Sequence, residues 1–171
     1  MKPPRWIQGP LAILVWVVAV QPAHSQPDFS GTWILDRTSS QIPAPRGIPE
    51  WLLAGELTFA ITHQGAALKI ERRVKALLVE RSLVTTYYTD GREVVNRNPR
   101  GEPVHSRSSW QGNALVTELR GTVERNGKKE TMEGKDVLRL SDDGRILTLE
   151  SIRRVGGDTD AQQARLTFVK R

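Results

Sequence analysis

Pairs of turn-forming residues interrupt this chain at short intervals from residue 64 onward. They are Gln-Gly at 64–65, Asp-Gly at 90–91, Gly-Asn at 112–113, Asn-Gly at 126–127 and Asp-Gly at 143–144. Glycine, asparagine and aspartate tolerate the positive φ angles of a tight hairpin, so each pair predicts an antiparallel reversal. The segments between them are rich in Val, Leu, Thr, Ile and Tyr. The pattern predicts an all-β meander of about 8–10 strands.

The last three turn signals predict strand pairings that agree with one another, because a two-residue turn fixes which residues face each other. One face then carries charged pairs, which stabilise a sheet modestly. These are Arg107 with Glu118, Glu118 with Lys135, Arg120 with Glu133, Glu124 with Lys129, and Glu133 with Arg154. The other face carries apolar pairs. These are Trp110 with Leu115, Leu115 with Leu138, Leu138 with Leu149, and Leu140 with Leu147.

The turn signal at 64–65 gives a further apolar face, with Ile61 opposite Leu68 and Phe59 opposite Ile70. A meander with one apolar and one polar face has two exposed edges, and closing it into a barrel removes them. A two-sheet sandwich would need longer crossover connections than these turns allow. We therefore predict an antiparallel up-and-down β-barrel.

The first 25 residues have the three parts of a secretory signal peptide. Lys2 and Arg5 precede the apolar run "LAILVWVVAV", and small residues follow up to Ser25. That run is shorter than the roughly 20 residues that cross a bilayer, and an uncleaved membrane anchor is the alternative. We expect cleavage near Ser25, export to the periplasm or secretion, and a barrel domain over 26–171 with no stable membrane anchor.

The composition argues against several functional classes. The net charge of +6 is spread along the chain, whereas nucleic-acid binding favours a concentrated basic face. Cysteine is absent, so an exported chain of this kind folds without disulfides and has no cysteine nucleophile. There is no Gly-x-Ser-x-Gly motif, and beyond the leader only His63 and His105 remain, far apart in sequence. We predict no enzymatic activity, no cofactor and no metal site.

The stretch "PDFSGTWILD" begins the expected mature chain, with Phe29, Gly31 and Trp33 at alternate positions. In a closed meander, a glycine lets the first strand bend over the end of the barrel, and the tryptophan fills that end. The pattern resembles the first strand of the calycin superfamily: the G-x-W of lipocalins and, more closely, the F-x-G-x-W of fatty-acid-binding proteins. The segments "WQGNALV" (110–116) and "ARLTFVKR" (164–171) also resemble late strands of the second family.

This resemblance implies a lipocalin-like barrel in a small exported bacterial protein. It also implies a short helix or lid after the first strand, where "PEWLLAGE" (49–56) stands. Fatty-acid-binding proteins hold a carboxylate partly through an Arg-x-Tyr pair near the end of the chain. Here the corresponding residues are Arg165, Leu166 and Thr167, so the resemblance does not imply a fatty-acid ligand.

The predicted pairings place a polar belt beside the apolar inner layer. An inward aspartate needs a partner, and Arg153 lies diagonal to Asp136. The pair either faces a ligand or holds the register at the barrel mouth. A small-molecule pocket combines an apolar body with a few fixed polar groups, so we take the belt and its nearest aromatic residue as candidate ligand-binding residues. These are Ser108, Trp110, Thr117, Asp136, Ser151 and Arg153.

We therefore predict an exported protein that binds a small apolar or amphipathic molecule without chemistry. The alternative is an interaction module with a packed barrel, whose surface binds another envelope or secreted protein. An open lumen separates the two, because only a binder needs one. The register of residues 74–104, the ligand and the oligomeric state stay open at this point.

Overall fold

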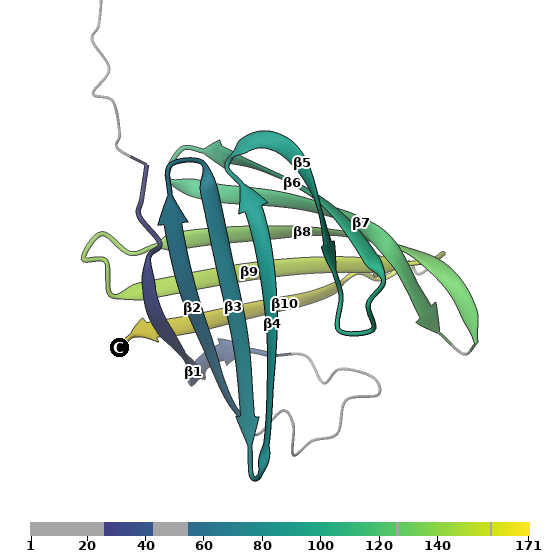
Figure 1. The fold of residues 1–171 in the computed structure, drawn as a ribbon, viewed down its shortest axis with the longest axis horizontal. Coiled ribbons are helices and arrows are strands. Elements are labelled where there is room, and N and C mark those ends of the chain that lie inside the picture. Colours follow the sequence, from purple (N-terminus) through teal and green to yellow (C-terminus); the bar gives the residue numbers. More distant parts are fainter. Residues whose placement is uncertain (1–25, 43–54, 126, 158) are drawn as a thin grey trace, which may run out of the picture.

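The computed structural model shows ten antiparallel strands that follow one another along the chain (Figure 1). It describes residues 26–42, 55–125, 127–157 and 159–171. The strands are β1 (Gly31–Gln41), β2 (Glu56–Gln64), β3 (Ala67–Ala76), β4 (Val79–Tyr88), β5 (Asp90–Arg97), β6 (Pro103–Gln111), β7 (Ala114–Arg125), β8 (Lys128–Leu140), β9 (Ile146–Val155) and β10 (Gln162–Lys170). No helix among the described residues is long and apolar enough to cross a membrane. The predicted all-β antiparallel meander is confirmed.

Two sequence predictions fall mainly outside the described residues. The signal peptide over 1–25 lies there entirely, and so does most of the helix or lid predicted over 49–56. The described part of the second segment is Gly55, in a bend, and Glu56, the first residue of β2. The signal peptide and the lid therefore stay predictions.

The barrel closes through β1, which bonds to β2 and to β10 at once. Trp33 of β1 pairs with Phe59 on one side and with Lys170 on the other. The hydrogen-bonded order is β4-β3-β2-β1-β10-β9-β8-β7-β6-β5, so β4 and β5 are its two edges. In Figure 1, β2, β3 and β4 pass across β8, β9 and β10 at a steep angle, and the apolar core lies between these two halves.

The edges β4 and β5 meet at a seam that backbone pairing does not close. The predicted reversal lies one residue earlier than 90–91, at Thr89, and Asp90 and Gly91, whose φ is +85°, are the first two residues of β5. However, β4 and β5 do not pair with each other through their backbones. Both strands therefore remain edges, and the barrel is nearly but not fully closed. The Asn96 side chain bridges the seam: its Oδ1 accepts from the Thr86 N–H at 2.9 Å, and its Nδ2 donates to the Thr86 carbonyl at 2.8 Å. One side-chain amide thus replaces a backbone pair.

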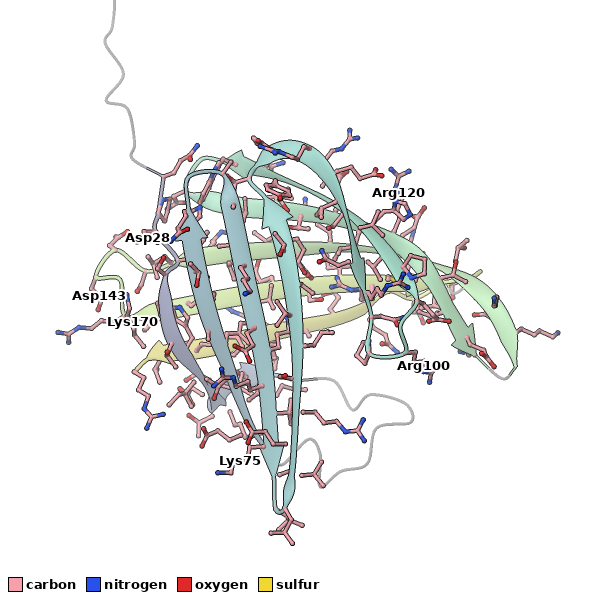
Figure 2. All side chains as sticks on the ribbon, in the orientation of Figure 1. Asp28, Lys75, Arg100, Arg120, Asp143 and Lys170 are labelled. Atoms are coloured by element: carbon pink, nitrogen blue, oxygen red, sulfur yellow. The ribbon has the colours of Figure 1, made fainter. Side chains whose placement is uncertain are left out.

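The strand pairings predicted from 112–113, 126–127 and 143–144 are confirmed across β6, β7, β8 and β9. The charged pairs lie on the outer face, where Arg120 is exposed (Figure 2). The apolar pairs lie inside, and Leu115, Leu138 and Leu147 are buried. The three hairpins therefore predicted the correct inner face.

The pairings predicted from the turn at 64–65 are wrong by two residues. Ile61 pairs with Ile70 instead of Leu68, and Phe59 pairs with Arg72 instead of Ile70. The physical reason is that Gly65, with a φ of +57°, occupies the first position of the turn and not the second. A shift of two residues keeps every side chain on its face, so the predicted inner residues are still buried.

The "FSGTW" stretch seals one end of the barrel as predicted. Phe29 and Trp33 are 0% exposed, and the Trp33 Nε1–H donates to the Phe29 carbonyl at 2.9 Å. Gly31 has a φ of +141°, which favours glycine, and a Cβ there would lie 2.8 Å from the Lys170 Cε. The Lys170 ammonium lies 5.2 Å from the Trp33 ring centre. Glycine is therefore needed for the bend, whereas the flexible end of Lys170 is free to move away from a Cβ.

Replacing Trp33 with alanine is expected to lower the free energy of unfolding by about 3–5 kcal/mol, because the indole is fully buried and its removal leaves a cavity. Urea denaturation followed by circular dichroism measures the change. Val95→Ala, a truncation on the outer surface, is the control. Equal unfolding midpoints for the two variants would show that Trp33 does not act as a plug.

Asn96→Ala is expected to open the seam and to lower the free energy of unfolding by about 1–2 kcal/mol, because two hydrogen bonds to Thr86 are lost. Hydrogen exchange at the Thr86 amide tests the local effect directly, since that N–H loses its acceptor. Asn113→Ala, in the exposed β6–β7 turn, is the control. Unchanged exchange at Thr86 would contradict the bridging role.

Candidate functional site

A cavity of about 430 Å³ lies inside the barrel, at the end opposite the Trp33 plug. The β5–β6 turn contributes Asn98 and Pro99 to its wall. Its apolar lining includes Leu57, Phe59, Leu83, Val104, Leu119, Met132, Leu149, Ala164 and Leu166. A cavity of this size accommodates a small molecule. The lumen is therefore open at this end and not packed shut.

The cavity forms where the inward positions change from large to small side chains. Near the plug, large residues such as Phe168 and Leu147 are 0% exposed and fill the barrel. Further along the same strands, the pairings bring Asp136, Ser151 and Ala164 side by side on the inner face. These side chains are too short to meet the opposite wall, so a space is left.

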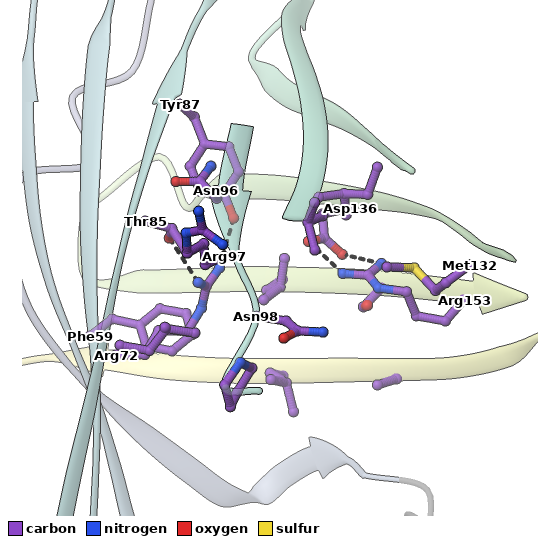
Figure 3. Close-up of a pocket in the computed structure, with 18 of the residues that line it drawn as sticks. Phe59, Arg72, Thr85, Tyr87, Asn96, Arg97, Asn98, Met132, Asp136 and Arg153 are labelled. Carbon is purple, nitrogen blue, oxygen red and sulfur yellow. Dashed lines mark hydrogen bonds and ion pairs between the residues drawn. The ribbon is translucent and has the colours of Figure 1, made fainter. Parts of the chain in front are cut away.

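One polar centre in the cavity is an ion pair between β8 and β9. The Arg153 Nη1 lies 2.7 Å from the Asp136 Oδ1, and its Nη2 donates to Oδ2 at 2.8 Å (Figure 3). Arg153 reaches this position over Gly134, its partner in the ladder, where a Cβ would lie 2.6 Å from the Arg153 Cδ. Asp136 is only 8% exposed. The guanidinium of Arg153 therefore has its counter-charge within the protein.

A second polar centre lies across the cavity, on β3 and β4. The Arg72 Nη1 donates to the Thr85 Oγ1 at 2.8 Å, and its Nη2 donates to the Tyr87 hydroxyl at 3.1 Å (Figure 3). The guanidinium carbon lies 5.4 Å from the centre of the Phe59 ring. Among the described residues, no ion pair is formed by Arg72. This half-buried positive charge thus has hydrogen-bond acceptors but no counter-charge.

The structure distributes the six candidate residues over two levels of the barrel. Asp136, Ser151 and Arg153 line the cavity, and Thr117 lines a much smaller pocket beneath it. The remaining two line neither pocket. Ser108 is buried with its Oγ 2.7 Å from the Thr117 Oγ1, and the Trp110 ring stacks on Phe29 at 5.6 Å.

The sequence analysis missed Arg72, Thr85 and Tyr87, and it also missed the polar cavity residues Asn96, Arg97 and Asn98. The two-residue alternation of a strand predicts that Arg72 points inward, because Leu68 and Ile70 point inward and Arg72 is the next residue on the same face. The pairing of β3 with β4 then brings Thr85 and Tyr87 to the same face. Only the second step was unavailable from the sequence, since the register of residues 74–104 was open.

No protein-family model and no curated protein matches the sequence. The fold is similar to that of several solved structures. The fluorescent protein UnaG has a TM-score of 0.56 and 17% identity, over 84% of this chain and 97% of UnaG. The fatty acid transporter REP1-NXSQ has a TM-score of 0.53 and 14% identity, over 84% and 96%. The fatty-acid-binding protein of Manduca sexta has a TM-score of 0.51 and 12% identity, over 83% and 99%.

At these identities the likeness is one of fold. It extends over almost the whole length of each of the three structures. It agrees with the antiparallel β-barrel that the sequence predicts.

Asp136→Asn is expected to lower the free energy of unfolding by about 1–3 kcal/mol, because the Arg153 guanidinium is left without its carboxylate. Thermal and urea denaturation at neutral pH measure the change. Asp142→Asn, an exposed carboxylate in the β8–β9 turn, is the matched control. If both variants were as stable as the native chain, the ion pair would make no net contribution.

Proposed function

We propose that this protein is exported and binds a small amphipathic molecule in the barrel cavity without changing it chemically. The observation that carries the proposal is the open cavity of about 430 Å³, with an apolar wall and polar groups at two places. Small-molecule sites have this composition. The similar folds include a fatty acid transporter and a fatty-acid-binding protein, which agrees with an apolar ligand body.

The charges of the cavity favour a ligand with an anionic end. Three arginines line it, Arg72, Arg97 and Arg153, against the single carboxylate of Asp136. Because Asp136 already neutralises Arg153, Arg72 is the inward cation that gains most from an added anion. Holding an uncompensated charge in a partly desolvated site is unfavourable, and a carboxylate, sulfate or phosphate group of the ligand removes that cost.

The hydrogen bonds around Arg72 prepare it for an anion. Thr85 and Tyr87 hold the guanidinium in place through two of its N–H groups, which leaves others for the ligand. The Tyr87 oxygen accepts from Arg72, so its own O–H is available as a donor. Arg72 and Tyr87 together therefore present charge-assisted donors to one group. The apolar part of the ligand then lies against Leu83 and Leu149 in the cavity wall.

Titration with two fluorescent probes tests this function. We expect the native protein to bind both anionic 8-anilinonaphthalene-1-sulfonate and neutral N-phenyl-1-naphthylamine. Arg72→Met keeps the apolar volume but removes the charge. We expect it to weaken binding of the anionic probe roughly tenfold or more, since a hydrogen bond to a charged group contributes about 1.5–3 kcal/mol, and to leave the neutral probe unaffected.

Arg165→Met, a removal of charge on the outer face of β10, is the matched control and is expected to change neither affinity. Failure of the native protein to bind either probe would contradict cavity binding altogether. If Arg72→Met weakened the binding of both probes equally, the cavity would still be a binding site, but the proposed preference for an anionic end group would be wrong.

A further inference from the structure

Two polar side chains on the β8–β9 wall of the cavity have hydrogen-bonding capacity that the described part of the protein does not use. Asp136 and Ser151 pair directly across the two strands, and both line the cavity. Asp136 is buried and Ser151 is half-buried. Directly opposed residues of an antiparallel pair have Cβ atoms about 4.5–5.5 Å apart. One small group of a ligand can therefore contact both side chains.

The Asp136 carboxylate is neutralised in charge but is not saturated with hydrogen bonds. Its Oδ2 accepts from the Arg153 Nη2 at 2.8 Å. The Arg153 Nη1 lies 2.7 Å from Oδ1, but it donates to the backbone carbonyls of Ile152 at 3.0 Å and Lys135 at 3.4 Å. Oδ1 accepts no hydrogen bond from the described residues. A carboxylate has about four lone-pair sites, so Asp136 has room for a donor that approaches from the cavity.

The Ser151 hydroxyl also has unused capacity. It forms no hydrogen bond with any other described residue, although a hydroxyl can both donate and accept. Beside it, the Asp136 carboxylate can only accept. A ligand group that suits the two together donates a hydrogen bond to the carboxylate and exchanges another with the hydroxyl. A hydroxyl group or a secondary amide meets both conditions.

The charge on this wall favours a neutral donor over an ammonium group. The Arg153 guanidinium already binds the Asp136 carboxylate, and it would repel a second cation placed beside it. A hydroxyl or an amide N–H brings no charge and avoids this repulsion. The acid group of the ligand belongs to the opposite wall, where Arg72 lies (Figure 3) without an ion-pair partner among the described residues.

Arg72 and Asp136 both extend to the floor of the cavity. There they line the same small pocket of about 20 Å³, which has room for about one water molecule. Two ligand groups that bind Arg72 and Asp136 across so small a space are joined by only a few bonds. The donor therefore stands close to the acid group of the ligand, and the apolar chain extends from both into the larger cavity.

We propose that the ligand is an acid with an apolar chain and, next to the acid group, a neutral hydrogen-bond donor, either a hydroxyl or an amide N–H. The anion binds Arg72, and the donor binds the Asp136 carboxylate with the Ser151 hydroxyl beside it. This inference rests on the proposed function and names the class of ligand within it. Hydroxy acids and N-acyl amino acids both have this chemistry.

Displacement of bound 8-anilinonaphthalene-1-sulfonate by matched acids tests the inference on the native protein. 3-Hydroxydecanoate and N-octanoylglycine carry the donor. In 3-methoxydecanoate and N-octanoylsarcosine a methyl group replaces its hydrogen, and decanoate lacks the group altogether. We expect at least one donor-bearing acid to bind roughly tenfold more tightly than its methylated partner and than decanoate, because hydrogen bonds to charged groups are strong. The pair that shows this preference distinguishes a hydroxy acid from an N-acyl amino acid.

Two variants locate the donor site. Ser151→Ala removes a hydroxyl without a partner among the described residues, so it should fold as the native chain does. Asp136→Leu/Arg153→Met removes both charges together, so that neither is left buried alone. We expect the preference for the donor to fall roughly threefold in the first variant and to vanish in the second. Ser109→Ala, on the outer face of β6, is the matched control and should keep the native preference.

The outcomes separate this inference from the proposed function. Binding of decanoate with no preference for the donor in either pair would overturn the inference and leave the proposed function in place. Failure of the native protein to bind the fluorescent probe or any of the acids would contradict cavity binding itself. A donor preference that persisted unchanged in both Ser151→Ala and the double variant would overturn the assignment to Asp136 and Ser151.

Discussion

The bonding of β1 to two strands at once is the constraint on which the barrel depends. Through Trp33 the strand pairs with Phe59 of β2 and with Lys170 of β10, and so joins the beginning of the meander to its end. Gly31 permits the bend that this double pairing requires, and the indole then occupies the space that the bend encloses. Residues 29–33 therefore both seal one end of the barrel and begin the pairing of β1 with its two neighbours.

Sealing one end sets where a ligand can lie. The aromatic and leucine side chains near Trp33 use up the space inside, and the shorter side chains toward the other end leave a cavity. Two of the three arginines that line this cavity, Arg72 and Arg153, differ in their surroundings. Arg153 is neutralised by Asp136, whereas Arg72 has only the neutral oxygens of Thr85 and Tyr87. This difference is the reason that we propose an anion site on the β3–β4 side of the cavity.

The β3–β4 hairpin also connects the cavity with the outside of the barrel. Its inner face contributes Arg72 and Tyr87 to the cavity. Its outer edge, β4, forms the seam, where Asn96 binds Thr86. Its end exposes Leu77 and Leu78 to solvent. β4 has a ladder partner only on the β3 side. A strand bonded on one side yields more readily than one bonded on both. The hairpin that contributes Arg72 to the cavity is therefore also the less constrained edge of the barrel.

The sequence by itself determined the strands, their inner face and the pairings of β6 to β9, because tight turns and two-residue alternation are local properties. It did not place the turn near Gly65, since moving that turn changes the partners but leaves each side chain on its face. Only the tertiary structure decided the seam between β4 and β5 and the meeting of Arg72 with Tyr87. An Asp-Gly turn has the same local form whether or not the strands beside it pair. The cavity likewise depends on the summed volumes of side chains from strands far apart in the chain, which no local pattern contains.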